Sequence, residues 1–365
     1  MSLLLIRGGL LARRYFLIRC TVVVMCGVLV ALASARSAQA VLVYERQRPS
    51  VSQIPRQGMI VVANDDGSNP RVIAKGTFPV VAPDGRHVAF FAGHSGGRGL
   101  WVVRVDGSHR RRLVRHTAPR TNFEIYNPLA WSPDSRYIVG NIATPCLASG
   151  HCGTNVPVTL VNIGRGVLAR YPDIDPLDGA AFSPDSRRFV LGQAPPNSPN
   201  PNLVGTLKLA KTPRPKHLRS LGPGEVPAWG QPGLAYMRPN TDGLDPSFNE
   251  IDLVAAPGGV PRPLFRGKAP NGDRLAVIVG WANGPGDLLA GVDDGSTKRD
   301  IQPVLIDPRT RTMKYFPPKL TRISAISRDG STVLGESLQR EVVAVRADGT
   351  VKVLASHADS VTWTS

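Results

Sequence analysis

The sequence predicts an all-β protein, a seven-bladed β-propeller built from four-stranded antiparallel blades. A turn motif recurs at intervals close to the length of one such blade. Short apolar runs rich in β-branched residues lie between the turns, which is typical of strands. The 37 glycines and 33 prolines among 365 residues interrupt the chain too often for a helical bundle, while 42% apolar residues suffice for a packed core.

The recurring turn is clearest at Ala82–Arg86, Ser132–Arg136 and Ser183–Arg187, where Pro-Asp is followed by Gly or Ser and then Arg. Proline fixes φ at the first turn position, aspartate accepts hydrogen bonds from nearby amides, and glycine or serine closes the turn. Degenerate copies follow at residues 229–233, 281–284 and 327–330. The residues that lead into the six turns are 45 to 52 positions apart: Val81, Trp131, Phe182, Trp229, Trp281 and Ile326.

Each repeat continues with a second strand after the turn, a third strand after a loop, and a more polar outer strand. Second strands include His87–Phe91, Tyr137–Val139 and Arg188–Leu191. Third strands are expected at Leu100–Val105, Val156–Asn162, Asn249–Val254, Val304–Asp307 and Glu341–Arg346. Outer strands are expected at Arg111–Arg115, Lys216–Ser220, Pro263–Arg266, Met313–Phe316 and Val351–Ala355.

The ends of the chain decide the number of blades. Three strands remain at the start, Val41–Glu45, Met59–Asn64 and Arg71–Lys75, and one remains at the finish, Val361–Trp363. Three strands plus one make a seventh sheet with the C-terminal strand innermost, and such closure removes two exposed edges. Six blades are the alternative, if the terminal segments only cap the array.

The first forty residues predict a signal peptide. Arginines without any acidic residue precede an apolar run from Cys20 to Ala33, and Ser37–Ala40 supplies a small-x-small cleavage site. The apolar run is short for a bilayer, so we expect cleavage and no transmembrane anchor afterwards. Arg13-Arg14 also fits a twin-arginine signal, so export by the Sec route or the twin-arginine route is expected. Residues 41–365 then form a single propeller domain.

Two cysteines remain after cleavage, Cys146 and Cys152. In an oxidising compartment, a disulfide between them is the expected outcome. A metal site would recruit His151 as a third ligand, but no second Cys/His cluster accompanies it, and no metal is predicted.

The charge remains strongly positive without the signal peptide. The first forty residues hold five of the 44 Lys and Arg and none of the 27 Asp and Glu, so residues 41–365 carry a formal net charge of +12. This balance favours anionic partners, namely wall polymers, phospholipid headgroups or acidic proteins, and the expected compartment argues against nucleic acid. The densest run, His109–Arg112 with Arg115, falls on an expected edge strand, where charge prevents edge-to-edge pairing.

The repeat resembles a known family. The W/F-S-P-D-G/S-R turn, a third strand ending in Asp-Gly and an R-x-L outer strand are similar to the TolB-type, WD-repeat-related propeller repeat of bacterial envelope proteins. The resemblance extends over residues 41–365 and implies a propeller of the bacterial envelope. TolB itself has six blades and an additional N-terminal α/β domain, whereas the repeats here predict seven blades and one domain.

A search for catalytic motifs yields no catalytic residue and no cofactor. The run His94–Gly99 lacks the spacing of a G-x-S-x-G elbow, and the α/β-hydrolase domain of propeller-gated serine peptidases is not expected. Zincin, EF-hand and P-loop patterns are absent from the sequence. Asp65–Ser68 and Asp293–Ser296 lack the alternating aspartates of a Ca²⁺ loop, and turn chemistry accounts for them.

Long loops indicate a candidate binding face. Loops after second strands and loops between blades share one face of a propeller, and binding residues concentrate on loops held by a rigid scaffold. The expected loops on this face are Thr117–Asn127, Thr144–Asn155, Tyr171–Gly179, Gln193–Asn202, Arg238–Asn249 and Val292–Asp300. The candidate binding residues are Phe123, Glu124, Tyr126, His151, Asp173, Asp175 and Asp178. Loops without any ligand are the alternative.

These observations lead to two hypotheses of different kinds. The first is an exported, non-catalytic, monomeric propeller that binds an envelope protein, a peptide or an anionic wall polymer on its loop face. The second is a small propeller enzyme, similar to a lactonase, lyase or glycosidase, that uses rim carboxylates such as Glu124, Asp173 or Asp175. A passive scaffold held to the wall by its charge is a third alternative.

Overall fold

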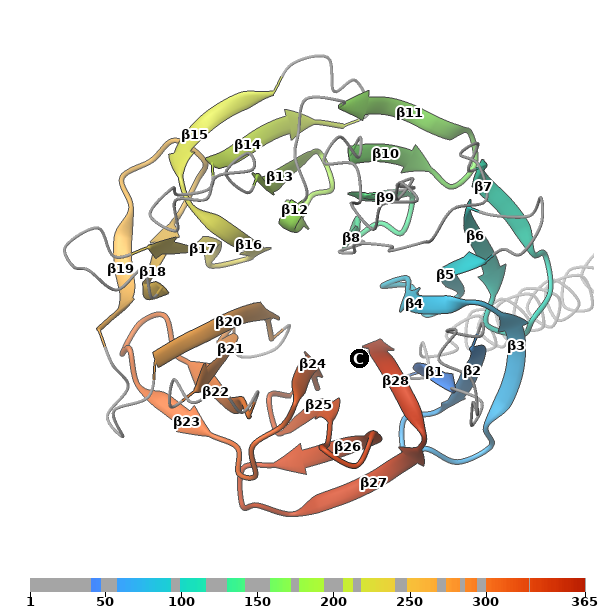
Figure 1. The fold of residues 1–365 in the computed structure, drawn as a ribbon. Helices are drawn as coiled ribbons and strands as arrows, with labels where there is room; N and C mark the ends of the chain where they lie inside the picture. Colours follow the sequence, from blue (N-terminus) through green and yellow to red (C-terminus); the bar gives the residue numbers. More distant parts are fainter. Residues whose placement is uncertain are drawn as a thin grey trace, which may run out of the picture. The chain divides into compact units, whose positions relative to one another are not determined.

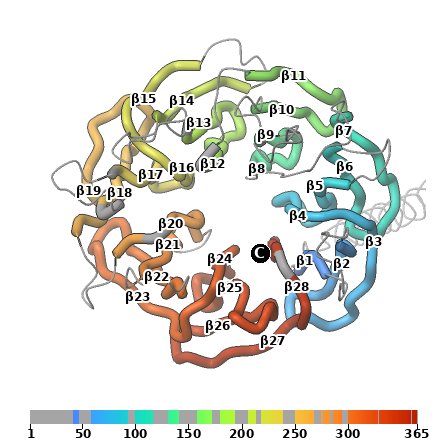
Figure 2. The backbone as a smooth tube through the Cα atoms, viewed as in Figure 1, coloured from blue at the N-terminus to red at the C-terminus, as the bar shows by residue number. Residues whose placement is uncertain are grey.

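The computed structural model describes residues 41–46, 58–92, 99–115, 130–141, 158–171, 177–193, 206–212, 218–239, 248–267, 274–282, 286–293, 300–327 and 329–364, all in the unit Ala40–Ser365. These residues form seven four-stranded antiparallel sheets arranged in a ring (Figure 1). The tube view shows the chain advancing blade by blade around the ring (Figure 2). The predicted all-β, seven-bladed propeller is confirmed, and the described residues include no helix that could span a membrane.

Each blade places its four strands in order from the centre of the ring outward (Figure 1). The innermost strands of blades 1 to 7 are β4 (Thr77–Val81), β8 (Ala130–Trp131), β12 (Leu177–Phe182), β16 (Glu225–Gly230), β20 (Arg274–Trp281), β24 (Arg322–Ile326) and β28 (Ala358–Thr364). The second strands are β5 (His87–Ala92), β9 (Tyr137–Asn141), β13 (Arg188–Gln193), β17 (Gly233–Pro239), β21 (Leu288–Asp293), β25 (Thr332–Glu336) and β1 (Val41–Arg46).

The outer half of each blade is equally regular. The third strands are β6 (Gly99–Arg104), β10 (Val158–Asn162), β14 (Thr206–Lys211), β18 (Phe248–Val254), β22 (Gln302–Ile306), β26 (Glu341–Arg346) and β2 (Met59–Asn64). The outermost strands are β7 (Arg111–Arg115), β11 (Gly166–Tyr171), β15 (Arg219–Pro223), β19 (Arg262–Arg266), β23 (Met313–Tyr315), β27 (Val351–Ser356) and β3 (Arg71–Lys75).

The ring closes through the two ends of the domain. Strand β28 pairs antiparallel with β1, with Leu42 opposite Trp363 and Val43 opposite Thr362. The Thr362 hydroxyl also accepts a hydrogen bond from the Val81 amide, 3.2 Å away on blade 1, so both sides of the seam are bonded. This pairing confirms seven blades and excludes the six-bladed alternative.

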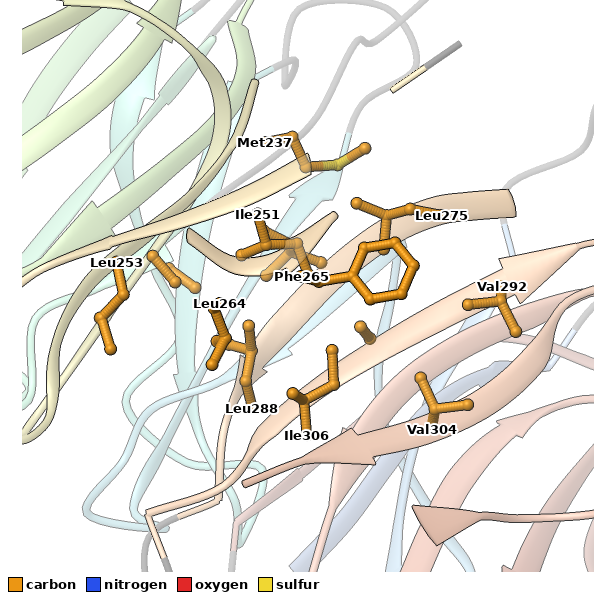
Figure 3. Packing of buried hydrophobic residues seen from close by; sticks show 14 residues of the cluster. Met237, Ile251, Leu253, Leu264, Phe265, Leu275, Leu288, Val292, Val304 and Ile306 are labelled. Atoms are coloured by element: carbon orange, nitrogen blue, oxygen red, sulfur yellow. The ribbon is translucent and has the colours of Figure 1, made fainter. Parts of the chain in front are cut away.

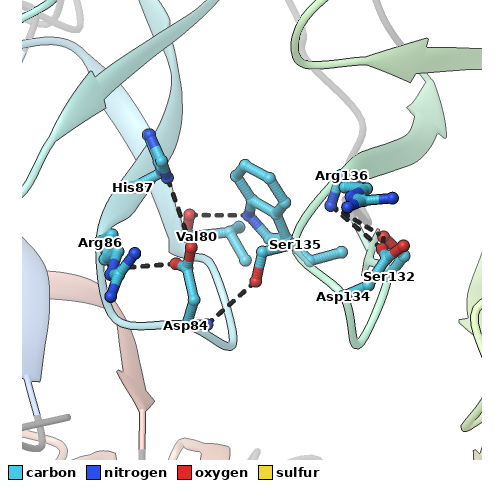
Figure 4. Close-up of polar contacts among 9 residues, drawn as sticks. Val80, Asp84, Arg86, His87, Ser132, Asp134, Ser135 and Arg136 are labelled. Carbon is cyan, nitrogen blue, oxygen red and sulfur yellow. Dashed lines mark hydrogen bonds and ion pairs between the residues drawn. The ribbon is translucent and has the colours of Figure 1, made fainter. Parts of the chain in front are cut away.

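The aspartate turns link neighbouring blades. In the turn of blade 2, the Ser132 hydroxyl donates to Asp134 at 2.6 Å, and the Asp134 carboxylate accepts from the Arg136 amide (Figure 4). Ser135 adopts a left-handed φ of 58°, a conformation that glycine supplies at the same place in blade 1. The Ser135 hydroxyl accepts from the Asp84 amide of blade 1 at 3.0 Å (Figure 4). Ser186 repeats this contact toward Asp134, so the turn residues also join one blade to the next.

Apolar side chains fill the spaces between blades. The largest cluster packs blade 4 against blade 5, with Ile251, Leu253 and Phe265 facing Leu288 and Ile306 (Figure 3). Burial of each such side chain contributes roughly 1.5–3 kcal/mol, so these interfaces supply most of the favourable energy of the ring. The core therefore lies between neighbouring sheets.

One outer strand differs from its expected position. Blade 3 was expected to end with a strand over 216–220, whereas β15 spans Arg219–Pro223. A register shift between Leu207 and Lys208 of β14 lets β15 continue pairing through Gly222 and Pro223. Proline is tolerated there because the strand is an edge, where a missing N–H removes no ladder bond.

Candidate functional site

Two faces of the ring differ in their connections. Strands alternate in direction, so the ends of second strands and the ends of outer strands lie on one face, here called the loop face. The strand ends flanking segments 116–129, 142–157 and 194–205 all lie there. The opposite face, called the turn face, carries the short aspartate turns such as 132–136 and 183–187. The asymmetry has the form predicted from the sequence.

Most of the predicted site residues lie outside the described residues. This applies to Phe123, Glu124, Tyr126, His151, Asp173 and Asp175, and to the predicted disulfide partners Cys146 and Cys152. Asp178 is the exception, and its predicted place in a loop is wrong. The residue lies within β12, where pairing with β13 shifts between Leu177 and Gly179, so Asp178 is the extra residue of a β-bulge.

A charged cluster lies near the loop face of blade 4 and was missed from the sequence. Arg238 on β17 approaches two carboxylates of β18, Glu250 at 2.9 Å and Asp252 at 3.3 Å. Arg266 on β19 bonds the same Glu250 oxygen at 2.7 Å, and the Tyr236 hydroxyl lies 3.5 Å from Asp252. We call these five residues the Arg238 cluster. The sequence does contain a signal for this cluster. Polar residues occur at alternate positions of β17 (Tyr236, Arg238) and β18 (Glu250, Asp252), where apolar residues are expected.

Burial sets the ionisation of this cluster. The side chain of Asp252 is only 1% exposed, and loss of hydration raises the pKa of its carboxyl group despite the nearby Arg238. Burial also opposes charge on Glu250, yet hydrogen bonds from Arg238 and Arg266 outweigh it and lower the pKa. Burial and the Asp252 charge raise the pKa of Tyr236 to about 12. The cluster therefore holds one readily ionised carboxylate beside one that resists ionisation.

Two glutamates, the buried Glu45 and the half-buried Glu336, hold the inner strands where these bulge. Phe78 and Ser360 have left-handed φ values of 51° and 52° at irregular points of β4 and β28. The Phe78 amide donates to Glu45 at 3.1 Å, and the Ser360 amide donates to Glu336 at 2.7 Å. In both pairs the glutamate comes from the second strand of the preceding blade. These carboxylates therefore have a structural task that the sequence analysis did not recognise.

Several carboxylates of the turn face accept hydrogen bonds within their own turns. Asp66, Asp106 and Asp348 each accept a hydrogen bond from the amide two residues later, as turn chemistry predicts. Within the described ranges, no group of three or more His, Cys, Asp or Glu side chains is arranged to hold a metal ion.

A pocket of about 540 Å³ lies between blades 6 and 7 near the turn face. Asp65 and Asp66 line one side, Arg346 and Lys352 line another, and Trp363 contributes an apolar wall. The lining of the pocket therefore carries charges of both signs.

The charged side chains of the described outer strands are all basic. Every outer strand carries at least one exposed Lys or Arg, and none of the seven contains an Asp or Glu. We call these residues the basic belt: Arg71, Lys75, Arg111, Arg112, Arg115, Arg170, Arg219, Arg262, Arg266, Lys314 and Lys352.

Comparisons with known proteins agree with the fold. No family model matches the chain, and no curated protein matches its sequence. The β-propeller domain of the Trilobed protease from Pyrococcus furiosus, which has an open velcro topology, is similar at 12% identity and a TM-score of 0.57, over 87% of this chain and 93% of that one. An acylaminoacyl peptidase from Pyrococcus horikoshii is similar at 12% identity and a TM-score of 0.61, over 87% of this chain. This chain spans about half of that peptidase (51%).

TolB from Acinetobacter baumannii is also similar, at 12% identity and a TM-score of 0.46, over 92% of this chain and 70% of that one. Together with the seven sheets, the similarity to the propeller domain of the Trilobed protease defines the class of the protein as a β-propeller, the fold that the sequence repeat predicted. Unlike a ring with open velcro topology, this one is closed by hydrogen bonds between β28 and β1.

Proposed function

We propose that the protein is an exported, non-catalytic β-propeller that binds a protein, peptide or cell-wall polymer on its loop face. The observation that carries the proposal is the asymmetry between the two faces. Long connections start and end at the loop face, whereas the described connections of the turn face are short, and several of them are closed by their own aspartates. A rigid ring that holds long loops on one face is the usual architecture of a binding surface.

Three described glutamates near this face favour a binding role over catalysis. Glu45 and Glu336 accept hydrogen bonds from backbone amides, and Glu250 is bonded to two arginines. A general acid or base needs a carboxyl group that can reach substrate. None of these three described glutamates is free to do so, which supports a binding role.

Export is supported by where the domain begins. The predicted cleavage after Ala40 leaves Val41 as the first residue, and Val41 is also the first residue of β1. A signal peptidase would therefore remove the whole segment before the first strand without shortening the closing sheet. Sequencing the N-terminus of the protein from an envelope fraction is expected to begin at Val41.

The binding proposal is tested by quantitative pull-down from envelope extract with three matched baits. The wild-type domain is compared with a loop-face variant, Phe123→Ala/Tyr126→Ala, and with a turn-face control, Val260→Ala/Arg309→Ala, both of whose residues are exposed. The loop-face variant is expected to capture at least tenfold less of a specific partner than the wild-type domain, whereas the control should capture as much as the wild type. Equal capture by all three baits would contradict the proposal.

A further inference from the structure

The charges of the basic belt are all positive, and the need to keep sheet edges from pairing with other chains does not explain this. Charged residues of either sign keep sheet edges from pairing with other chains. The seven outer strands instead use only Lys and Arg, although like charges placed close together repel one another. Exclusive use of one sign on every edge indicates an anionic partner that offsets this repulsion.

Several arginines of the belt are fixed without losing their charge. The Arg219 guanidinium donates to the Pro257 carbonyl at 3.3 Å, and Arg262 donates to the Pro308 carbonyl at 3.1 Å. Arg111 makes the same contact with the Ile163 carbonyl. In each case the acceptor is a neutral carbonyl in the outer turn of the next blade. Each guanidinium is therefore positioned while its charge stays available.

The belt is densest where blade 7 meets blade 1. Arg71 and Lys75 lie on β3, Arg111, Arg112 and Arg115 lie on β7, and Arg110 directly precedes β7. The Arg110 guanidinium carbon lies 4.7 Å from the centre of the Trp101 ring, and that of Arg112 lies 5.7 Å from it. Cation–π contact with one indole restrains both guanidinium groups, which lowers the entropy lost when they bind an anion.

We propose that the outer edge of the ring, centred on β3 and β7, binds a flexible linear polyanion bearing phosphate or carboxylate groups, as an anionic wall polymer does. Guanidinium groups bind both anions through paired hydrogen bonds. A flexible chain can follow the curved edge from blade to blade, whereas a planar membrane or a stiff duplex meets only a short arc of it. This site is separate from the loop face and does not depend on a ligand there.

The experiment measures binding of labelled inorganic polyphosphate to the domain at a series of salt concentrations. The belt variant is Arg110→Gln/Arg111→Gln/Arg112→Gln. A charge-matched control, Arg309→Gln/Arg311→Gln/Arg346→Gln, removes three exposed arginines near the turn face of blades 5 and 6. Circular dichroism and a thermal melt verify that both variants fold.

At physiological salt, the belt variant is expected to bind polyphosphate at least tenfold more weakly than the wild type. A plot of the logarithm of the binding constant against the logarithm of the salt concentration should be less steep for the belt variant, by about 2 in slope. Each lost cation lowers the magnitude of this slope by roughly 0.7 when the ligand is a flexible strand. The control should lose less than threefold, since distant charges are screened within about 8 Å. Equal losses in both variants, or equally tight binding of phosphatidylglycerol vesicles or duplex DNA, would overturn the proposal.

Discussion

The indole nitrogen of Trp131 donates a hydrogen bond to the backbone carbonyl of Val80, 3.0 Å away on the preceding blade (Figure 4). Trp281 repeats the contact toward Ala228 at 3.1 Å. Trp363 occupies the corresponding strand of blade 7, yet its buried indole nitrogen has no hydrogen-bond partner among the described residues. Trp131 and Trp281 therefore each form a hydrogen bond to the preceding blade, whereas the indole of Trp363 contributes to blade 7 by packing alone.

Replacing Trp131 by phenylalanine is expected to lower the free energy of unfolding by about 2 kcal/mol. About half of the loss comes from the hydrogen bond and the rest from the smaller ring. Trp363→Phe is the matched control and should cost less, because its indole donates no bond. Urea unfolding of the two variants measures the difference. An equal loss in both would show that the bond to Val80 contributes nothing.

Closure of the ring depends on the apolar contacts of β28. Val361 is 2% exposed within the cluster that joins blades 6 and 7, so Val361→Asp is expected to lower the free energy of unfolding by more than about 3 kcal/mol. Val260→Asp makes the same change at a residue that is 89% exposed and should cost less than about 0.5 kcal/mol. Urea unfolding midpoints compare the two. A stable Val361→Asp ring would mean that the last strand is not needed for closure.

The turn of blade 6 predicts a dependence of stability on acid pH. Hydrogen bonds from Ser327 and Ser331 lower the pKa of Asp329 to about 2. The stability from this ionised group is present above its unfolded pKa of about 3.9, and it is lost as pH falls through 2.

The difference in stability between the wild type and Asp329→Asn should therefore shrink as pH falls from 4 to 2. Thermal melts of both proteins at a series of pH values measure this difference. A constant difference for Asp329→Asn would contradict the prediction.

The Arg238 cluster predicts an unequal effect of its two arginines. Arg238→Leu leaves the buried Asp252 without its cation and is expected to cost about 3 kcal/mol. Arg266 is 64% exposed, so Arg266→Leu should cost less than about 1 kcal/mol. The double variant Arg238→Leu/Asp252→Leu should recover most of the loss, because neither charge is then buried alone. Failure to recover would mean that Arg238 acts mainly by packing.

The predicted disulfide between Cys146 and Cys152 is open to a direct test. Peptide mapping of the exported protein under non-reducing conditions should find the two cysteines in one linked peptide. The Cys146→Ser/Cys152→Ser variant should lose roughly 2 kcal/mol, because the bond closes only a short loop. Recovery of two free thiols from the exported protein would exclude the bond.

The sequence by itself determined the repeat, the type of element and the closing strands. Proline and aspartate act within a single turn, and the apolar alternation of a strand is local. Turns and strands can therefore be recognised from the sequence alone. Counting the strands at the two ends of the chain also predicted that the last strand completes the sheet of the first ones, as the pairing of β28 with β1 confirms.

Only the tertiary structure decided the contacts between strands that are distant in sequence. Arg238 pairs with Asp252 of the neighbouring strand, and Glu45 accepts a hydrogen bond from an amide of the next blade. Asp178 is the extra residue of a β-bulge because of how β12 pairs with β13. These relationships depend on how strands align and where they twist. Spacing along the chain does not carry that information, because register and bulges arise from packing of whole sheets.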